Sequence, residues 1–186
     1  RITAMLGNIG YANAEVNPVP DINRETQEIS INFTVNPGPR VQVRRIEVTG
    51  NVRTADEVIR RELRQFENSW YSQSSLGRSK IRLQRLGFFE TVDVESKPVP
   101  GRPDQVDVVL NVKERNSGSF VFGLGYQQLY GLTASVQVSE NNFLGSGNRI
   151  AVNVQNNSYS KRLSFSYSDP YFTESGVSLG YNLSFS

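Results

Sequence analysis

The chain has 186 residues, with 20 Lys and Arg against 18 Asp and Glu and a net charge of +2. It contains no cysteine and no histidine. These absences exclude disulfides, thiolate metal sites, imidazole ligands and histidine general bases. The length provides for one complete domain and parts of two others.

Residues 1–38 have the pattern of the second half of an α+β domain. A helix is predicted at the start, ended by Gly10, because apolar residues recur there at helical spacing. We expect Tyr11–Val19 to be an irregular edge strand that Pro18 and Pro20 keep from pairing further. A turn at Asp21–Glu25 then leads to a half-buried strand with four alternating apolar residues, which are Ile29, Ile31, Phe33 and Val35.

Residues 39–116 repeat this unit and also contain the N-terminal half that the first copy lacks. A strand over 41–48 ends at Gly50, and Thr54 and Glu57 form a capping box for a first helix. A second helix is expected from near Ser72 to Gly87, followed by strands over 88–99 and 106–112. The first helix is predicted to bury one face and expose another; the buried residues are Ile59, Leu63 and Phe66, and the exposed ones Arg60, Arg61 and Arg64.

An internal repeat relates the two units by a shift of 77 residues. The four apolar positions of the strand at 29–35 correspond to those at 106–112, and Gly10 corresponds to Gly87. Tandem β-α-α-β-β units are therefore predicted. Only Lys113–Asn116 separates the second unit from the remainder of the chain.

The last 70 residues are of a different kind, beginning with the stretch Gly118–Gly131. They carry three of the 20 basic and three of the 18 acidic residues. Five segments of about ten residues alternate apolar with small or polar side chains, as the wall of a transmembrane β-barrel does. A soluble antiparallel sheet is the alternative. The alternating segments begin at Ser119, Leu132, Ile150, Tyr159 and Val177.

The connections between these strands support the membrane interpretation. Asn141–Gly147 and Asp169–Thr173 lie at the same end of an up-and-down meander, and both carry aromatic residues, as an interfacial belt does. The opposite turns are mainly polar apart from Leu129 and Tyr130. Because five strands cannot close a barrel, we expect the sequence to stop inside one and both termini to lie within a longer protein.

Enzymatic and nucleic-acid functions have little support. The glycine pairs at Gly123 and Gly145 lack the rest of a phosphate-binding motif. Asp104 and Asp107 lie on one strand without a visible cause for a raised pKa. A basic face of Lys80, Arg82 and Arg85 lacks the interleaved aromatics of a nucleic-acid site, so we interpret it as solvated or facing lipid headgroups.

Several motifs occur in a fixed order, and the chain resembles the BamA family of POTRA-plus-barrel outer-membrane proteins. Members of this family are central subunits of the Gram-negative β-barrel assembly machinery. The resemblance covers the whole chain. The motifs are RRELRQ-E-W at residues 60–70, RLGFFETVDV at 85–94, PDQVDVV at 103–109, VKERNSGSF at 112–120, NNFLGSG at 141–147 and DPYF at 169–172.

The resemblance implies three parts in a fixed order. Residues 1–38 would be the end of the fourth POTRA domain, 39–116 the whole fifth domain, and 117–186 the first five strands of a transmembrane barrel. The expected function is folding and inserting β-barrel proteins in the outer membrane without catalysis, metal or cofactor. Client strands would pair with the edge of the first barrel strand, through Phe120, Val121, Phe122, Gly123, Leu124, Gly125 and Tyr126.

Partners are also implied. Arg60 and Glu67 match positions through which the fifth domain docks the lipoprotein BamD, and both are expected as exposed charges on the first helix. The strand over 88–97 would be an edge for binding by strand addition. Other expected partners are further lipoproteins of the complex, unfolded outer-membrane proteins and outer-membrane lipid, but not nucleic acid. The alternative is a two-partner secretion transporter that exports an exoprotein.

Overall fold

The computed structural model describes residues 1–23, 27–129, 131–173 and 175–186. These form two compact units. The first comprises Arg1–Gly50, Glu62–Arg85 and Thr91–Val112, and the second comprises Asn51–Arg61, Leu86–Glu90 and Lys113–Ser186. None of the helices in these ranges is long and apolar enough to cross a membrane.

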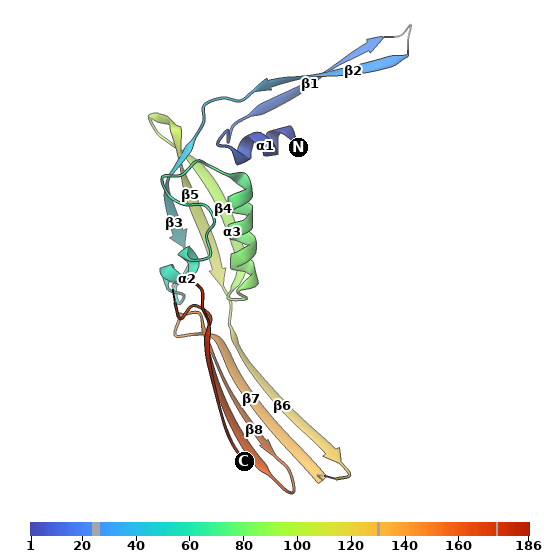
Figure 1. Ribbon diagram of the computed structural model, residues 1–186, viewed down its shortest axis with the longest axis vertical. Coiled ribbons are helices and arrows are strands. Elements are labelled where there is room, and N and C mark those ends of the chain that lie inside the picture. Colours follow the sequence, from blue (N-terminus) through green and yellow to red (C-terminus); the bar gives the residue numbers. More distant parts are fainter. Residues whose placement is uncertain (24–26, 130, 174) are drawn as a thin grey trace. The chain divides into compact units, whose positions relative to one another are not determined.

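A three-stranded sheet of order β3-β5-β4 lies beside a long helix (Figure 1). The strands are β3 (Gln42–Thr49), β4 (Phe89–Val99) and β5 (Arg102–Glu114), and the helix is α3 (Gln73–Arg85). The β3 and β5 strands are parallel. Leu76 and Leu83 of α3 are buried, and so are the sheet residues Val43, Ile46, Val92, Val108 and Leu110.

The start of the chain forms a helix and a hairpin, α1 (Ile2–Asn8), β1 (Glu15–Asn23) and β2 (Glu28–Asn36). The expectation that two prolines limit the pairing of the first strand is wrong, since Pro18 pairs with Phe33 and Pro20 with Ile31 inside a continuous ladder. Prolines two residues apart turn their nitrogens to the same side of a strand, so both fit where no N–H is donated. Of the turn expected at residues 21–25, residues 21–23 belong to β1, and residues 24 and 25 lie outside the described residues.

The repeat is visible in the fold. β2 and β5 contain the corresponding apolar strand positions, and α1 and α3 are each followed by a glycine with a positive φ, Gly10 at 106° and Gly87 at 76°. α1 contacts α3, and the Val41 N–H donates to the carbonyl of Gly10. The first unit therefore joins the two copies of the repeat.

The predicted first helix is much shorter than expected. α2 spans only Asp56–Arg60, and Phe66 is 64% exposed rather than buried. The capping box is also wrong, because Ala55 is the N-cap residue and no side chain caps the helix. The Thr54 hydroxyl instead accepts a hydrogen bond from the Asn142 amide, so a distant contact replaces the local one.

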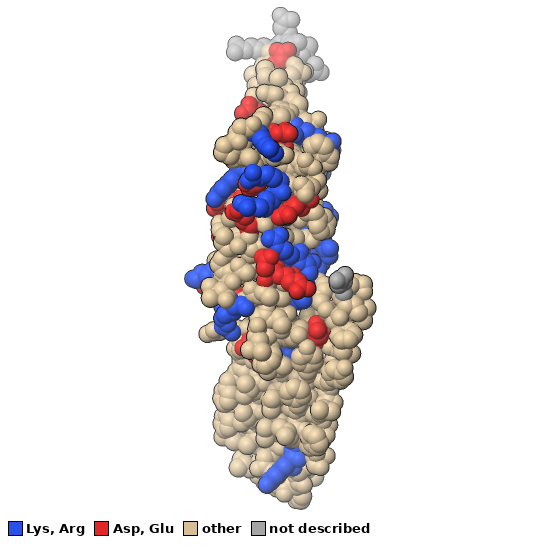
Figure 2. All heavy atoms as spheres, turned by 90° about the vertical axis from the view of Figure 1, so that its left-hand side faces the viewer, with Lys and Arg blue, Asp and Glu red and all other residues tan. Residues whose placement is uncertain are grey.

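Five antiparallel strands form a meander of order β10-β9-β8-β7-β6 (Figure 1). They are β6 (Gly118–Gln127), β7 (Gly131–Phe143), β8 (Asn148–Asn156), β9 (Lys161–Asp169) and β10 (Leu179–Phe185). Their register confirms the predicted alternation: Phe122, Val136 and Val154 are paired in turn across β6, β7 and β8. In Figure 2 the displayed face of this sheet is almost wholly uncharged.

We predict that Gly50→Ala destabilises the first unit by about 2 kcal/mol or more. Gly50 has φ +88°, and an added Cβ would lie 1.9 Å from the carbonyl oxygen of Val112, so the substitution combines backbone strain with a clash. Urea unfolding, followed by the fluorescence of Trp70 in the first unit, measures the loss. Gly77→Ala is the control: nothing lies within 4 Å of its Cβ, and it should raise helix stability by about 0.5–1 kcal/mol. Equal stability of the two variants would contradict the prediction.

Candidate strand-pairing edge

The strand β6 lies at one edge of the five-stranded sheet. It pairs with β7 along its whole length, from Gly118 opposite Glu140 to Gln127 opposite Gly131. In the described part of the chain it has no strand on its other side. Alternate residues of an antiparallel strand direct their N–H and C=O groups away from the neighbour. β6 therefore offers a row of backbone donors and acceptors to an additional strand.

All seven residues predicted for strand pairing lie on this edge strand. The four large side chains share one face: Phe120, Phe122, Leu124 and Tyr126 are opposite Val138, Val136, Ala134 and Leu132 of β7. These four are well exposed, Tyr126 to 75%. The opposite face carries Val121, Gly123 and Gly125. One face of β6 thus carries four large side chains, and the other carries a valine and two glycines.

The two glycines of β6 differ in their surroundings. An added Cβ at Gly123 would lie 2.7 Å from the Ser135 hydroxyl, whereas nothing lies within 4 Å at Gly125. Glycine in a strand lacks side-chain packing and weakens it. Close packing accounts for Gly123 but not for Gly125. A larger side chain would fit at position 125, so Gly125 weakens β6 although the packing does not require a glycine there.

The beginning of β6, by contrast, is held by side chains. The Ser117 hydroxyl donates to the Glu140 carboxylate, and the Ser119 and Ser139 hydroxyls are 2.7 Å apart. The Asn141 backbone and side-chain N–H groups both donate to the Ser117 carbonyl, each at 3.3 Å. The edge strand is therefore fixed at its first residues and becomes looser toward the glycines.

The turn between β7 and β8 is fixed to the segment before α2, within the second unit. Asn142 is 5% exposed; its Nδ2 donates to the Thr54 hydroxyl at 2.9 Å and its Oδ1 accepts from Gly147 N at 2.8 Å. The Ala55 N–H donates to the Gly145 carbonyl at 2.9 Å. A Cβ on Gly145 would lie 1.9 Å from the Arg53 carbonyl oxygen. Only glycine permits this approach.

A second turn also contacts the α2 region. The guanidinium of Arg61, the C-cap residue of α2, lies 4.2 Å from the ring centroid of Tyr171. This geometry gives an attractive cation–π interaction. Arg61 is thus not one of the solvated arginines expected from the sequence. The aromatic residue Tyr171, expected in an interfacial belt, contacts protein.

Glu114 at the end of β5 supports the same segment. Its carboxylate accepts hydrogen bonds from Arg53 N at 3.0 Å and from Thr54 N at 2.7 Å. Burial acts to raise the pKa of Glu114, but the hydrogen bonds from Thr54 and Arg53 outweigh it and hold the pKa below its usual value. Residues 53–55 are therefore held by Glu114 as well as by the turn at 142–147.

The two predicted docking residues are not on one helix face. Arg60 is the last residue of α2 and pairs with Asp56 one turn earlier. Glu67 lies beyond the helix, and its Oε1 accepts from Ile46 N at 2.8 Å. Glu67 is exposed, as expected, but it also bonds a strand backbone. The structure therefore places Arg60 on the helix and Glu67 in the loop beyond it.

Sequence patterns did not indicate the contacts of Asn142, Arg61 and Glu114. Each joins residues far apart in the chain, and none can be deduced from periodicity. The segment Asn141–Gly147 has only the sequence signature of a glycine-containing turn with an aromatic residue. Among the described residues no group of three or more His, Cys, Asp or Glu side chains is arranged to hold a metal ion.

Comparison with known proteins agrees with this architecture. Residues 1–38 and 41–115 match the family model POTRA, surface antigen variable number repeat. The chain belongs to the POTRA family. Residues 142–186 match the Omp85 superfamily domain, so the POTRA repeats are followed by strands of an Omp85 barrel.

Individual relatives extend the likeness over nearly the whole chain. The outer membrane protein assembly factor BamA of Neisseria meningitidis is 40% identical over 98% of the chain, which spans 24% of that relative's length. The crystal structure of BamA from Haemophilus ducreyi lacking POTRA domains 1–3 is 43% identical, with a TM-score of 0.91, and covers 98% of this chain and 34% of that one. CdiB from Escherichia coli, 18% identical with a TM-score of 0.58, shares the fold over 98% of this chain and 34% of that one.

We predict that the contribution of Glu114 to stability is lost in acid. Because its pKa is lowered on folding, the contribution is fully present above the unfolded pKa of about 4.3. It disappears as the pH falls through the lower folded value. Glu114→Gln should therefore be less stable than the unmodified chain at neutral pH, and the difference should shrink in acid. Urea unfolding over a pH series measures this.

The control for this prediction is Glu95→Gln. Its side chain is 56% exposed and lies 3.7 Å from Lys97, so the same charge is removed at a site that contributes little. A difference for Glu114→Gln that stays constant with pH would contradict the assignment of its hydrogen bonds.

Proposed function

We propose that the complete protein containing this chain is an outer-membrane assembly factor that folds and inserts β-barrel proteins. Its barrel strands lie in the outer membrane of a Gram-negative bacterium and its POTRA domains in the periplasm. Likeness to BamA proteins at 40% and 43% identity supports this function. The observation that carries the mechanism is the difference between the two halves of β6, whose first residues are held through Ser117 and Glu140, whereas nothing lies within 4 Å of a Cβ added at Gly125.

A client strand pairs with β6 through backbone hydrogen bonds. The side chains of the client contribute little to this pairing, so many different sequences are accepted. The pairing residues are those of the edge, Phe120, Val121, Phe122, Gly123, Leu124, Gly125 and Tyr126. Because the beginning of β6 is fixed through Ser117 and Glu140, its glycine-containing half is the part that separates from a closing strand and receives the client.

The three parts of the chain have distinct places in this protein. Residues 1–38 are the C-terminal part of the fourth POTRA domain, 39–116 are the fifth, and 117–186 are the first five strands of a larger barrel. The two matched POTRA ranges support this division. So does the likeness to a BamA that lacks only its first three POTRA domains.

Partner binding is assigned to the fifth POTRA domain. Arg60 and Glu67 dock the lipoprotein BamD, with other lipoproteins of the complex nearby. β4, which lies at an edge of its sheet, accepts client segments by strand addition. The exposed position of both charges supports the docking role. The assigned activity is non-covalent.

The alternative function, export of an exoprotein by a two-partner transporter, has weaker support. The likeness to CdiB, at 18% identity, concerns the fold alone. Five POTRA domains in the complete protein favour assembly and two favour secretion. Counting the domains upstream of Arg1 distinguishes the two functions.

We predict that a disulfide between Leu124→Cys and a cysteine on the last barrel strand of the full-length protein abolishes barrel assembly. The bond holds the edge of β6 against its closing strand, so no client strand can pair. Insertion of a model barrel protein into liposomes measures the effect, and a reductant should restore it.

The control places the first cysteine at Leu132 instead. Leu132 is also apolar and exposed but lies on β7, where it cannot lock the edge. Normal assembly with the Leu124 disulfide fully formed would reject the proposed mechanism.

We also predict that Glu67→Lys weakens co-purification of BamD by at least about tenfold, since it replaces attraction by repulsion at the docking surface. This substitution also removes the acceptor for Ile46 N. Glu67→Gln separates the two effects, because its amide oxygen still accepts that bond while the charge is gone. Glu67→Gln should fold normally and bind BamD less tightly. Unchanged BamD recovery with both variants would exclude Glu67 from the docking surface.

A further inference from the structure

A pocket lies beside the turn between β7 and β8, within the second unit. Its volume is about 520 Å³, and the segment before α2 forms part of its wall. The apolar lining consists of Phe143, Leu144 and Ile150, and the charged lining of Arg53 and Glu140. The pocket therefore combines an apolar wall with one cation and one anion.

The pocket belongs to the face of the sheet that carries the large apolar side chains. Ile150 shares this face of β8 with Val152, because alternate residues of a strand point to the same side. In the β7–β8 ladder Glu140 is opposite Ile150, and Phe143 is opposite Asn148, two residues before Ile150. Residues opposite each other lie on one face. The pocket therefore lies where the face proposed to contact lipid ends.

The conformation of Leu144 points to apolar surroundings. Its φ is +53°, in the left-handed region that bulky side chains rarely adopt, and its side chain is 87% exposed. The turn holds it there, since Gly145 N donates to the Asn142 carbonyl and Ser146 N to the Phe143 carbonyl, both at 3.1 Å. Contact with an acyl chain would remove this large apolar side chain from water.

Both charged side chains can form further hydrogen bonds. The Arg53 guanidinium donates to the Asn116 side-chain oxygen at 3.4 Å, and a guanidinium has five N–H groups. Glu140 Oε1 accepts from the Ser117 hydroxyl and from Asn142 N. Within the described ranges no donor bonds Glu140 Oε2, and Arg53 and Glu140 do not pair with each other. A ligand can therefore bond both.

This pair of opposite charges matches a zwitterionic headgroup. A guanidinium binds a phosphate through two parallel N–H bonds, and a primary ammonium ion donates to a carboxylate. An anionic headgroup would satisfy Arg53 but would be repelled by Glu140. A quaternary ammonium ion has no N–H to donate. The chemistry of the pocket therefore favours a phosphate that is linked to a primary amine.

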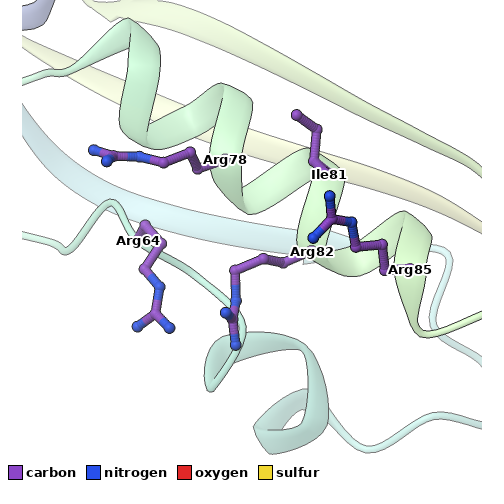
Figure 3. Close-up of a pocket in the computed structure, with 5 residues that line it drawn as sticks. All are labelled: Arg64, Arg78, Ile81, Arg82 and Arg85. Atoms are coloured by element: carbon purple, nitrogen blue, oxygen red, sulfur yellow. The ribbon is translucent and has the colours of Figure 1, made fainter.

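The groove beside α3 in the first unit has a different character. Its lining residues are Arg64, Arg78, Ile81, Arg82 and Arg85 (Figure 3), and none of them is acidic. Arg82 pairs with Glu62 at 2.6 Å, but the Glu62 side chain is buried. This groove offers no carboxylate to an ammonium ion, so it does not distinguish a zwitterion from an anion.

We propose that the pocket beside the β7–β8 turn binds the headgroup of an amine-bearing phospholipid. Its phosphate lies on Arg53, its ammonium group on Glu140, and its acyl chains along Phe143, Leu144 and Ile150. The inference rests on the membrane position of the barrel strands in the proposed function, and not on client pairing. It adds a lipid class and the residues that select it.

The test measures the apparent Kd of the first bound lipid by native mass spectrometry of the full-length protein in detergent micelles. The probes are dioleoyl phosphatidylethanolamine, phosphatidylcholine and phosphatidylglycerol, which share their acyl chains. We expect the ethanolamine lipid to bind about fivefold more tightly than the other two, because it alone gains the contact with Glu140. Phosphoethanolamine at equal concentration should not displace it.

Two variants separate the contacts. Arg53→Gln should raise the Kd for the ethanolamine lipid by about tenfold, because the phosphate loses its two-pronged partner. Glu140→Gln should bind the three lipids with similar affinity. Its amide oxygen still accepts from the Ser117 hydroxyl, so the beginning of β6 stays fixed.

The matched controls are Arg78→Gln and Glu95→Gln, which remove the same charges from the groove beside α3 and from an exposed position on β4. Each should change the Kd by less than about twofold. Equal affinity of the unmodified protein for the three lipids, or an ethanolamine preference that survives Glu140→Gln, would overturn the proposal. Tighter binding of phosphatidylglycerol would overturn it in favour of an anion site, and displacement by phosphoethanolamine in favour of a site for small zwitterions.

A separate measurement distinguishes this inference from the proposed function. Insertion of a model barrel protein into phosphatidylcholine liposomes requires no amine-bearing lipid. Insertion without any headgroup preference in the binding assay would reject the pocket and leave the assembly function standing. A headgroup preference without insertion would reject the assembly function and support the pocket.

Discussion

The need to satisfy backbone hydrogen bonds governs the second half of this molecule. A strand within a membrane has no water to bond, so each unpaired N–H or C=O group costs several kcal/mol. β6 has its partner on one side only in the described chain. A complete barrel satisfies its other side with a closing strand, and in the proposed function a client strand takes that place. The same backbone groups serve both, so closure and client binding compete.

This competition depends on how firmly β6 is held. Its first residues are bonded through Ser117, Ser119 and Glu140, whereas Gly125 has neither packing nor steric need. A strand fixed at one end and loose at the other separates from a neighbour progressively and does not leave the sheet. An incoming strand therefore meets an edge whose register is already set by β7.

The sequence was most informative where structure repeats. Strand alternation, the 77-residue repeat and the glycines after α1 and α3 correctly predicted the five-stranded meander, the corresponding strands β2 and β5 and the ends of the two helices, because each depends on local periodicity or backbone conformation. It failed where a distant residue decides the outcome. Thr54 has the spacing of a capping residue, but its hydroxyl bonds Asn142, 88 positions away. Pro18 and Pro20 suggest an unpaired segment because proline has no N–H to donate. Their two-residue spacing nevertheless places both nitrogens on the side of the strand where no N–H is needed, so they fit the β1–β2 ladder. The seven residues of the β6 edge were predicted from the resemblance to a known family. The side chains that fix the beginning of β6, such as Ser117 and Glu140, were not predicted because their contact joins residues far apart in the chain.

The short helix α2 also connects two proposed functions. Its last residue, Arg60, belongs to the proposed BamD-docking surface, and the next residue, Arg61, lies over Tyr171 in the turn between β9 and β10. The segment before α2 is bonded to the turn between β7 and β8 through Asn142 and Gly145. Val58 and Ile59 of α2 are buried, so the helix cannot shift without disturbing its packing. A protein bound at Arg60 therefore acts on a segment that is already bonded to the turns of the barrel strands. The Asn142 amide and the Arg61 guanidinium supply this connection, and the Glu114 carboxylate holds the segment before α2 from β5.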